Sequence, residues 1–109
     1  MGLEKTPTIR DKKFLSFVRA LGGPCILCRR RMGAEVPADD AHHFGSKGMG
    51  TKGSDYQVAR LCREHHMEVQ GKRRLAFARS GDWETLTALQ EDSIALLEAY
   101  IVAIARGQV

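Results

Sequence analysis

Cysteine and histidine, two residue types that commonly bind metals, occur close together in one short stretch of this sequence, at Cys62, His65 and His66. In a helix, Cys62 and His65 lie three positions apart on the same face, with the spacing of half a zinc site. His66 points elsewhere, because adjacent helical residues diverge by about 100°. The two histidines are therefore expected to serve two different centres, each with partners from earlier in the chain.

The first centre can draw its partners from a pair of thiols, Cys25 and Cys28. The arginines at 29–31 that follow should lower the thiol pKa values and favour metal binding. Together with Cys62 and His65, the thiols make a closed Cys3His set, which is typical of structural zinc. A redox pair would need a surrounding βαβ pattern, which is not evident here. In an alternative assignment, His66 is the fourth ligand and His65 does not bind the zinc.

The composition favours a small domain with reduced thiols. The chain has 109 residues, three cysteines, a formal net charge of +4 and a pI near 9.2. Three is an odd number for a disulfide framework, and neither a membrane-spanning run nor the apolar core of a signal peptide is evident, so we expect a cytoplasmic protein. A domain of this size has a modest core that a metal would help to stabilise. The basic balance favours a polyanionic partner such as nucleic acid.

The spacing of apolar residues predicts one α+β domain around these ligands. We expect a flexible arm over residues 1–7 and a helix over 8–22, then a turn at 24–28 that presents the two thiols. Two short strands, 39–44 and 56–61, flank a glycine-rich loop, and the second strand leads into a helix from Cys62 to about Arg79. The predicted zinc-stapled core therefore spans residues 24–79 in the order strand, loop, strand, helix.

A last helix is predicted over residues 82–106, with Asp82 as its N-cap. It carries a long apolar stripe that can pack on the core and also pair with a second copy in a homodimer. The stripe consists of Trp83, Leu86, Leu89, Leu96, Leu97, Tyr100, Ile101 and Ile104.

The motifs between Pro24 and Gln70, taken as an ordered set, resemble the HNH, or ββα-metal, family of endonucleases. The set comprises the Cys-x-x-Cys pair, a His-His pair, a loop rich in glycine and lysine, an aspartate, and Leu-Cys-Arg-Glu-His-His. It is similar to small prophage-type members, including the RecA-dependent Ref nuclease. The resemblance implies a small ββα-metal fold and a metal-dependent DNA endonuclease or nickase, whose products carry 5′-phosphate and 3′-hydroxyl ends.

Carried over by motif position, the resemblance implies that His43 is the general base. It also implies that His42 and His66 bind a catalytic divalent ion such as Mg²⁺ or Mn²⁺, distinct from the zinc. Many family members place a third His or Asn where this chain has Gln70. An amide oxygen binds transition metals more weakly than imidazole, so water or phosphate can fill that position.

The middle residue of the family motif, which orients the base, has two candidates. Asp55 would accept an imidazole N–H and make His43 more basic, whereas Gln57 has the spacing of the commonest family pattern. A further condition concerns His42 and His43, because neighbours in a regular strand face opposite sides. Both can serve one site only if the strand ends or bulges there.

Several basic residues are candidates for contacts with the DNA backbone, although a solvated surface is the alternative for each. They are Lys47, Lys52, Lys72, Arg73 and Arg74. Two other functional classes use only part of the pattern. A non-catalytic zinc-stabilised DNA-binding module needs the Cys3His set but not the other three histidines, and a protein-interaction domain would use the C-terminal stripe.

Overall fold

The computed structural model describes residues 9–45, 53–72 and 74–109 and confirms a small α+β fold, in which a β-hairpin packs on a long C-terminal helix. The predicted arm over residues 1–7, most of the glycine-rich loop, and Lys47, Lys52 and Arg73 lie outside these ranges. In the part of the chain that is described, no helix has the length and apolar character needed to cross a membrane.

The first helix, α1, spans Lys12–Leu21 and so begins four residues later than predicted. It starts there because the Asp11 carboxylate accepts the Phe14 backbone N–H at 3.0 Å and caps the first turn. Phe14 and Val18 are buried, whereas Leu21 is 47% exposed.

The predicted turn at 24–28 is wrong, because a second helix, α2, spans Ile26–Met32. Cys25 is its N-cap, with Sγ accepting the Cys28 backbone N–H at 3.5 Å. Gly33, with a φ of 63°, ends the helix in the left-handed region. The Cys-x-x-Cys pair therefore lies on the first turn of a helix, which fixes the relative position of the two sulfurs.

The hairpin pairs β1 (Asp40–His43) with β2 (Val58–Leu61) in antiparallel register, from Asp40 opposite Leu61 to His43 opposite Val58. Both strands are shorter than the predicted 39–44 and 56–61. Helix α3 (Arg63–Val69) follows β2 directly, with Cys62 at its N-cap. The hairpin and α3 thus have the predicted strand, loop, strand, helix order.

The predicted continuous helix from Cys62 to Arg79 is wrong. Helix α3 ends at Val69, and a separate helix, α4, spans Arg74–Ser80. Gly71 has a φ of 84°, a left-handed conformation that breaks the helical path. The backbone N–H of Arg74 then donates to the Phe44 carbonyl at 2.9 Å, so the chain turns back to the end of β1.

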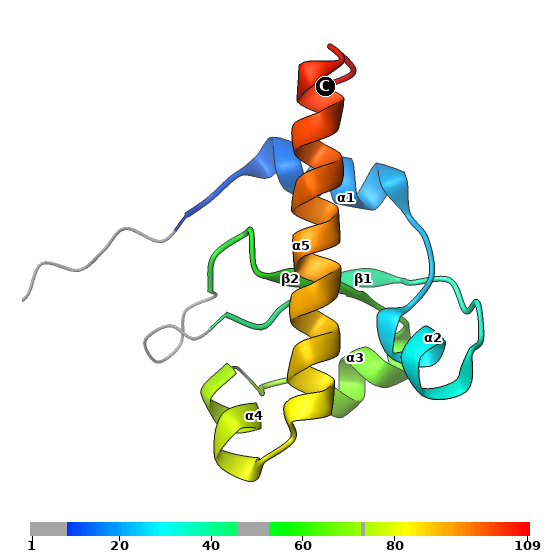
Figure 1. Ribbon diagram of the computed structural model, residues 1–109, viewed down its shortest axis with the longest axis vertical. Coiled ribbons are helices and arrows are strands. Elements are labelled where there is room, and N and C mark those ends of the chain that lie inside the picture. Colours follow the sequence, from blue (N-terminus) through cyan, green and yellow to red (C-terminus); the bar gives the residue numbers. More distant parts are fainter. Residues whose placement is uncertain (1–8, 46–52, 73) are drawn as a thin grey trace, which may run out of the picture.

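The last helix, α5 (Trp83–Ala105), is the long central helix, and β2, α1, α2 and α4 pack against it, whereas α3 contacts the two strands (Figure 1). Asp82 caps it by accepting the Thr85 backbone N–H at 3.2 Å. Its predicted stripe is not one buried face. Trp83, Ile101 and Ile104 are 60%, 58% and 50% exposed, while the buried members are Leu86, Leu89, Leu96 and Tyr100.

The core consists of two clusters. One surrounds the cysteines and includes Leu27, Phe44, Leu61, Val69, Phe77 and Leu89. The other joins α1 to the second half of α5 and consists of Phe14, Val18, Val58, Leu96 and Tyr100. Because the second cluster contains no cysteine, it does not depend directly on a metal for its packing.

A buried ion pair joins β2 to α5. Arg60 Nη2 lies 2.6 Å from Asp92 Oδ1, and the Arg60 backbone N–H donates to Asp92 Oδ2 at 2.8 Å; the Asp92 side chain is only 2% exposed. Arg60 Nη1 also donates to the Gly22 carbonyl at 3.0 Å. One carboxylate therefore holds a strand and, through Arg60, the end of α1.

Replacing Asp92 with alanine is expected to lower the free energy of unfolding by about 3 kcal/mol or more, because it leaves a buried guanidinium without its counter-ion. Urea denaturation of the zinc-saturated protein measures this change. The double variant Arg60→Ala, Asp92→Ala should lose less than the sum of the single changes. Additive losses would show that the two side chains do not stabilise the fold as a pair.

Candidate functional site

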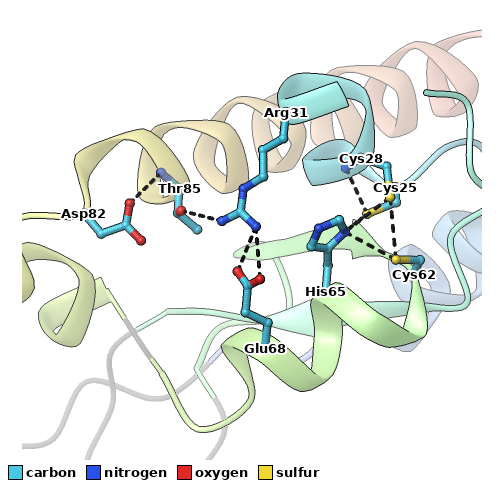
Figure 2. A network of polar contacts seen from close by, with 8 residues as sticks. All are labelled: Cys25, Cys28, Arg31, Cys62, His65, Glu68, Asp82 and Thr85. Carbon is cyan, nitrogen blue, oxygen red and sulfur yellow. Dashed lines mark hydrogen bonds and ion pairs between the residues drawn. The ribbon is translucent and has the colours of Figure 1, made fainter. Parts of the chain in front are cut away.

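Four ligand-type side chains converge between α2 and the start of α3: Cys25, Cys28, Cys62 and His65 (Figure 2). Their ligand atoms all lie within 4.8 Å of one another. His65 Nδ1 lies 3.5, 3.2 and 3.4 Å from the sulfurs of Cys25, Cys28 and Cys62, and the sulfurs of Cys28 and Cys62 are 3.7 Å apart. This is the predicted set of ligands. The alternative set, with His66 in place of His65, does not converge.

These distances fit a tetrahedral zinc ion. Zinc bonds of about 2.3 Å to sulfur and 2.0–2.1 Å to nitrogen place two sulfurs about 3.8 Å apart and a sulfur and a nitrogen about 3.6 Å apart. The three cysteines are buried, and no fifth His, Cys, Asp or Glu joins the group among the described residues. The cluster is consistent with a closed, structural zinc site.

The thiols also have the electrostatic character of a metal site. Burial, together with the neighbouring sulfurs of Cys62 and Cys25, raises the pKa of Cys28 to about 12. Burial acts in the same direction on Cys62, but the His65 backbone N–H and other hydrogen bonds outweigh it and hold the pKa of Cys62 below its usual value. Sulfurs this close cannot all ionise without a cation between them.

The expectation that the arginines at 29–31 lower the thiol pKa values is wrong for Cys28, whose pKa is raised by burial and by the neighbouring sulfurs. All three guanidinium groups pair with carboxylates instead. Arg31 binds both carboxylate oxygens of Glu68 at 3.1 and 2.8 Å and donates to Thr85 Oγ1 at 3.1 Å (Figure 2). Arg30 pairs with Glu91 at 2.5 Å. These contacts tie α2 to α3 and to the first turns of α5, beside the cysteine cluster.

A second arrangement lies at the end of β1, where His43 Nε2 is 2.9 Å from Asp55 Oδ1. Asp55 is 3% exposed. The Asp11 backbone N–H donates to its Oδ2 at 2.7 Å, and Arg10 Nη1 lies 3.3 Å from its Oδ1. Burial acts to raise the pKa of Asp55, but the Asp11 N–H, His43 and Arg10 outweigh it, so the pKa lies below its usual value. Asp55 is therefore an ionised carboxylate that holds the Nε2 edge of the His43 ring.

The support of Asp55 continues to α1 through a hydrogen bond between side chains. The Tyr56 hydroxyl donates to Asp11 Oδ2 at 2.7 Å. This bond, followed by the Phe14 backbone N–H, lowers the pKa of Asp11, and the same bond raises the pKa of Tyr56 above its usual 10. The residues before α1 and the residues before β2 are thus held together next to His43.

Replacing Tyr56 with phenylalanine is expected to cost about 1.5 kcal/mol of stability near neutral pH, the size of a hydrogen bond to a charged group. A depressed Asp11 pKa stabilises the fold above about pH 3.8, its unfolded value, and this part is lost as pH falls through the folded pKa. A raised Tyr56 pKa stabilises below about pH 10, and this part is lost as pH rises through the folded pKa. Denaturation of both proteins across pH measures the difference, and a difference independent of pH would contradict the assignment.

His42 and His66 form the third arrangement. Their ring centroids are 5.1 Å apart, at 63°. His42 is 6% exposed and contacts α3 through this ring, while His66 Nδ1 lies 3.7 Å from Asp40 Oδ2. The structure therefore places His66 apart from the cysteine cluster and against β1.

His42 and His43 have different neighbours, as expected for adjacent residues in a strand. The register of β1 and β2 has no bulge at either residue, but β1 ends at His43. Both rings can serve one site if the strand bulges or ends there, and in the structure the strand ends.

The other predicted site residues lie around this end of the hairpin. The Gln57 amide lies directly against the backbone of Gly45, where a Cβ would collide with its Oε1. Asp55, in contrast, contacts the ring of His43. Gln70 is the exposed C-cap of α3, and Lys72 and Arg74 are exposed on either side of the α3–α4 break.

Two features near these histidines were not predicted from the sequence. Asp40 lies two residues before His42, so the period of a strand could have placed both on one face. The contacts of Arg10 and Asp11 with Asp55 join residues more than forty positions apart. No local spacing signals such contacts.

The fold and the cysteine cluster define a small α+β protein with a candidate structural zinc site. The chain belongs to the family described as "Protein of unknown function (DUF968)", whose model matches residues 1–94. It is also 47% identical over 49 residues to the "Uncharacterized protein YdfU" of Escherichia coli (strain K12), a match that covers 42% of this chain and 12% of that protein. The chain thus matches only a small part of that relative's length. No solved structure matches this chain.

Proposed function

We propose that this protein is a metal-dependent DNA endonuclease or nickase of the HNH type, in which a structural zinc holds α2, β2 and α3 together. The observation that carries the proposal is the contact between His43 and the buried carboxylate of Asp55 at 2.9 Å. A histidine oriented by an ionised carboxylate is the usual way in which proteins prepare a general base near neutral pH.

The contact assigns a role to each nitrogen of His43. An ionised carboxylate can only accept a hydrogen bond, so Nε2 carries the hydrogen. In the neutral ring, Nδ1 is then the nitrogen that can take a proton from an attacking water. Asp55 also stabilises the charged ring that forms, because its carboxylate remains beside it. In this assignment Asp55, rather than Gln57, is the residue that orients the base.

His42 and His66 would hold a divalent ion such as Mg²⁺ or Mn²⁺. When bound, that ion would offset the negative charge that develops on the scissile phosphate. Because His42 and His43 have different neighbours, the phosphate has to approach the end of β1, where both rings can be reached. The exposed Lys72 and Arg74 beside this end can contact the DNA backbone without reading its sequence.

The homodimer predicted through α5 stays a prediction. Its candidate surface is the exposed part of the stripe, with Ile101 and Ile104 on the last turns of α5. Analytical ultracentrifugation at assay concentration tests it, and a monomer there would contradict it.

The test of the proposed function is the nicking of supercoiled plasmid by zinc-loaded protein with Mg²⁺, Mn²⁺ or excess EDTA. We expect nicking that requires the added divalent ion. The measurement has to be made with the zinc content checked after EDTA treatment, because loss of the structural ion would also stop the reaction. DNA binding without nicking in any metal would instead support the non-catalytic DNA-binding module. Absence of salt-dependent DNA binding would support the protein-interaction domain.

A further inference from the structure

A carboxylate that the family motif does not use lies beside His66. Asp40 is the first residue of β1 and lies two positions before His42, so both side chains lie on the same face of the strand. Asp40 Oδ2 is 3.7 Å from His66 Nδ1, and the His42 ring packs against the His66 ring. Ligand-type side chains from β1 and α3 therefore gather around His66.

Asp40 and His66 lie close to each other but are not hydrogen-bonded. A separation of 3.7 Å between nitrogen and oxygen is too long for a hydrogen bond. Two neighbouring ligand atoms of one octahedral Mg²⁺, each at about 2.0–2.1 Å from it, are about 2.9 Å apart, so a small rotation of the Asp40 side chain is enough to bring both atoms onto one ion. The Ala41 backbone N–H donates to Asp40 Oδ1 at 2.8 Å, which orients the carboxylate and leaves Oδ2 nearer to His66.

The space in front of Asp40 and His66 is open to a solvated ion. A pocket of about 410 Å³ is lined by Asp39, Asp40, Arg63, His66, Met67 and Gln70. The Asp40 side chain is 56% exposed and can rotate. Such a rotation is needed, because the ligand atoms of Asp40, His42 and His66 do not all lie within 4.8 Å of one another. Among the described residues, only the Cys3His set meets that condition.

Asp40 and Gln70 differ as ligands for such an ion. Mg²⁺ and Mn²⁺ prefer carboxylate oxygens, and the neutral amide of Gln70 adds no negative charge to a site with two imidazoles. We propose that Asp40, rather than Gln70, is the third protein ligand of the divalent ion held by His42 and His66. This assignment rests on the proposed function, since it completes the same site.

Binding of Mn²⁺ to the zinc-loaded protein tests this assignment without any measurement of activity. Electron paramagnetic resonance follows the loss of the free Mn²⁺ signal in wild type and three variants. Asp40→Asn keeps the size of the side chain and removes its charge. Asp39→Asn makes the same change of charge in the same pocket and is the matched control, and Gln70→Ala removes the alternative ligand. Zinc content and the far-ultraviolet circular dichroism spectrum confirm that each variant is folded.

We expect Asp40→Asn to weaken Mn²⁺ binding at least about tenfold, the size of the effect even for residues that only orient a ligand. Asp39→Asn and Gln70→Ala should each change the affinity by less than about threefold. Equal effects of Asp40→Asn and Asp39→Asn would overturn the assignment, as would wild type that binds no Mn²⁺, or Gln70→Ala as the damaging change. Plasmid nicking by wild type is scored separately. If wild type nicks DNA but Asp40→Asn binds Mn²⁺ with unchanged affinity, only the ligand assignment is contradicted. If Mn²⁺ binding depends on Asp40 but wild type does not nick DNA, only the proposed nuclease function is contradicted.

Discussion

His65→Ala is expected to abolish tight zinc binding, whereas His66→Ala is expected to retain one zinc ion per chain. The two residues are neighbours in α3, but only His65 has a ring nitrogen within 3.5 Å of all three cysteine sulfurs. His66 contacts His42 and lies near Asp40 instead. The pair of variants therefore removes the same side chain from two adjacent positions with opposite expected results.

The loss of zinc should have a large effect on stability. Zinc binding contributes about 10–16 kcal/mol to the folding of zinc-finger peptides, which equals or exceeds the stability of about 5–15 kcal/mol of an ordinary domain. We expect the cluster around the cysteines to lose its packing, while the cluster around Phe14, Leu96 and Tyr100 keeps part of its structure because it contains no ligand.

Zinc content, thermal unfolding and amide hydrogen exchange measure these effects. Exchange should become fastest in α2 and α3 of His65→Ala and change least in α1 and the second half of α5. The prediction fails if His66→Ala loses zinc as readily as His65→Ala. That result would favour the alternative in which His66 is the fourth ligand.

His43→Ala is expected to lower the rate of plasmid nicking by about 10²–10⁴-fold, which is the usual contribution of a general base. Asp55→Asn should lower it less, by about 10–100-fold, because the amide can still accept the Nε2 hydrogen but carries no charge to stabilise the protonated ring. Neither residue belongs to the cysteine cluster, so both variants should keep their zinc.

Gln57→Ala is the matched comparison for Asp55→Asn, since both residues precede β2 and each is a candidate for the middle position of the family motif. Gln57 lies against the backbone of Gly45 and does not replace the Asp55 contact with His43. We expect its loss to reduce nicking less than the loss of Asp55 does. Rates measured under single-turnover conditions make the comparison. A Gln57→Ala rate below that of Asp55→Asn would assign the middle position to Gln57, and a fully active His43→Ala would remove His43 as the base.

The spacing of residues by itself predicted the cysteine cluster, with His66 as an alternative to His65, and the order of strand, loop, strand and helix. Cys25 with Cys28, and Cys62 with His65, are each three positions apart, and a helical turn places such pairs side by side whatever the rest of the fold does. The same rule separated His65 from His66. Local geometry was sufficient because each half of the cluster comes from one short segment.

The tertiary structure alone decided the boundaries and the long-range contacts. The break between α3 and α4 combines the left-handed Gly71 with the hydrogen bond from the Arg74 backbone N–H to the Phe44 carbonyl, and a distant carbonyl leaves no trace in local spacing. The partner of His43 was one of two sequence candidates until the packing of Arg10 and Asp11 placed Asp55 beside the ring. Asp40 met His66 only when α3 folded onto β1. Such contacts join segments far apart in the chain, and only the packing of the whole domain fixes them.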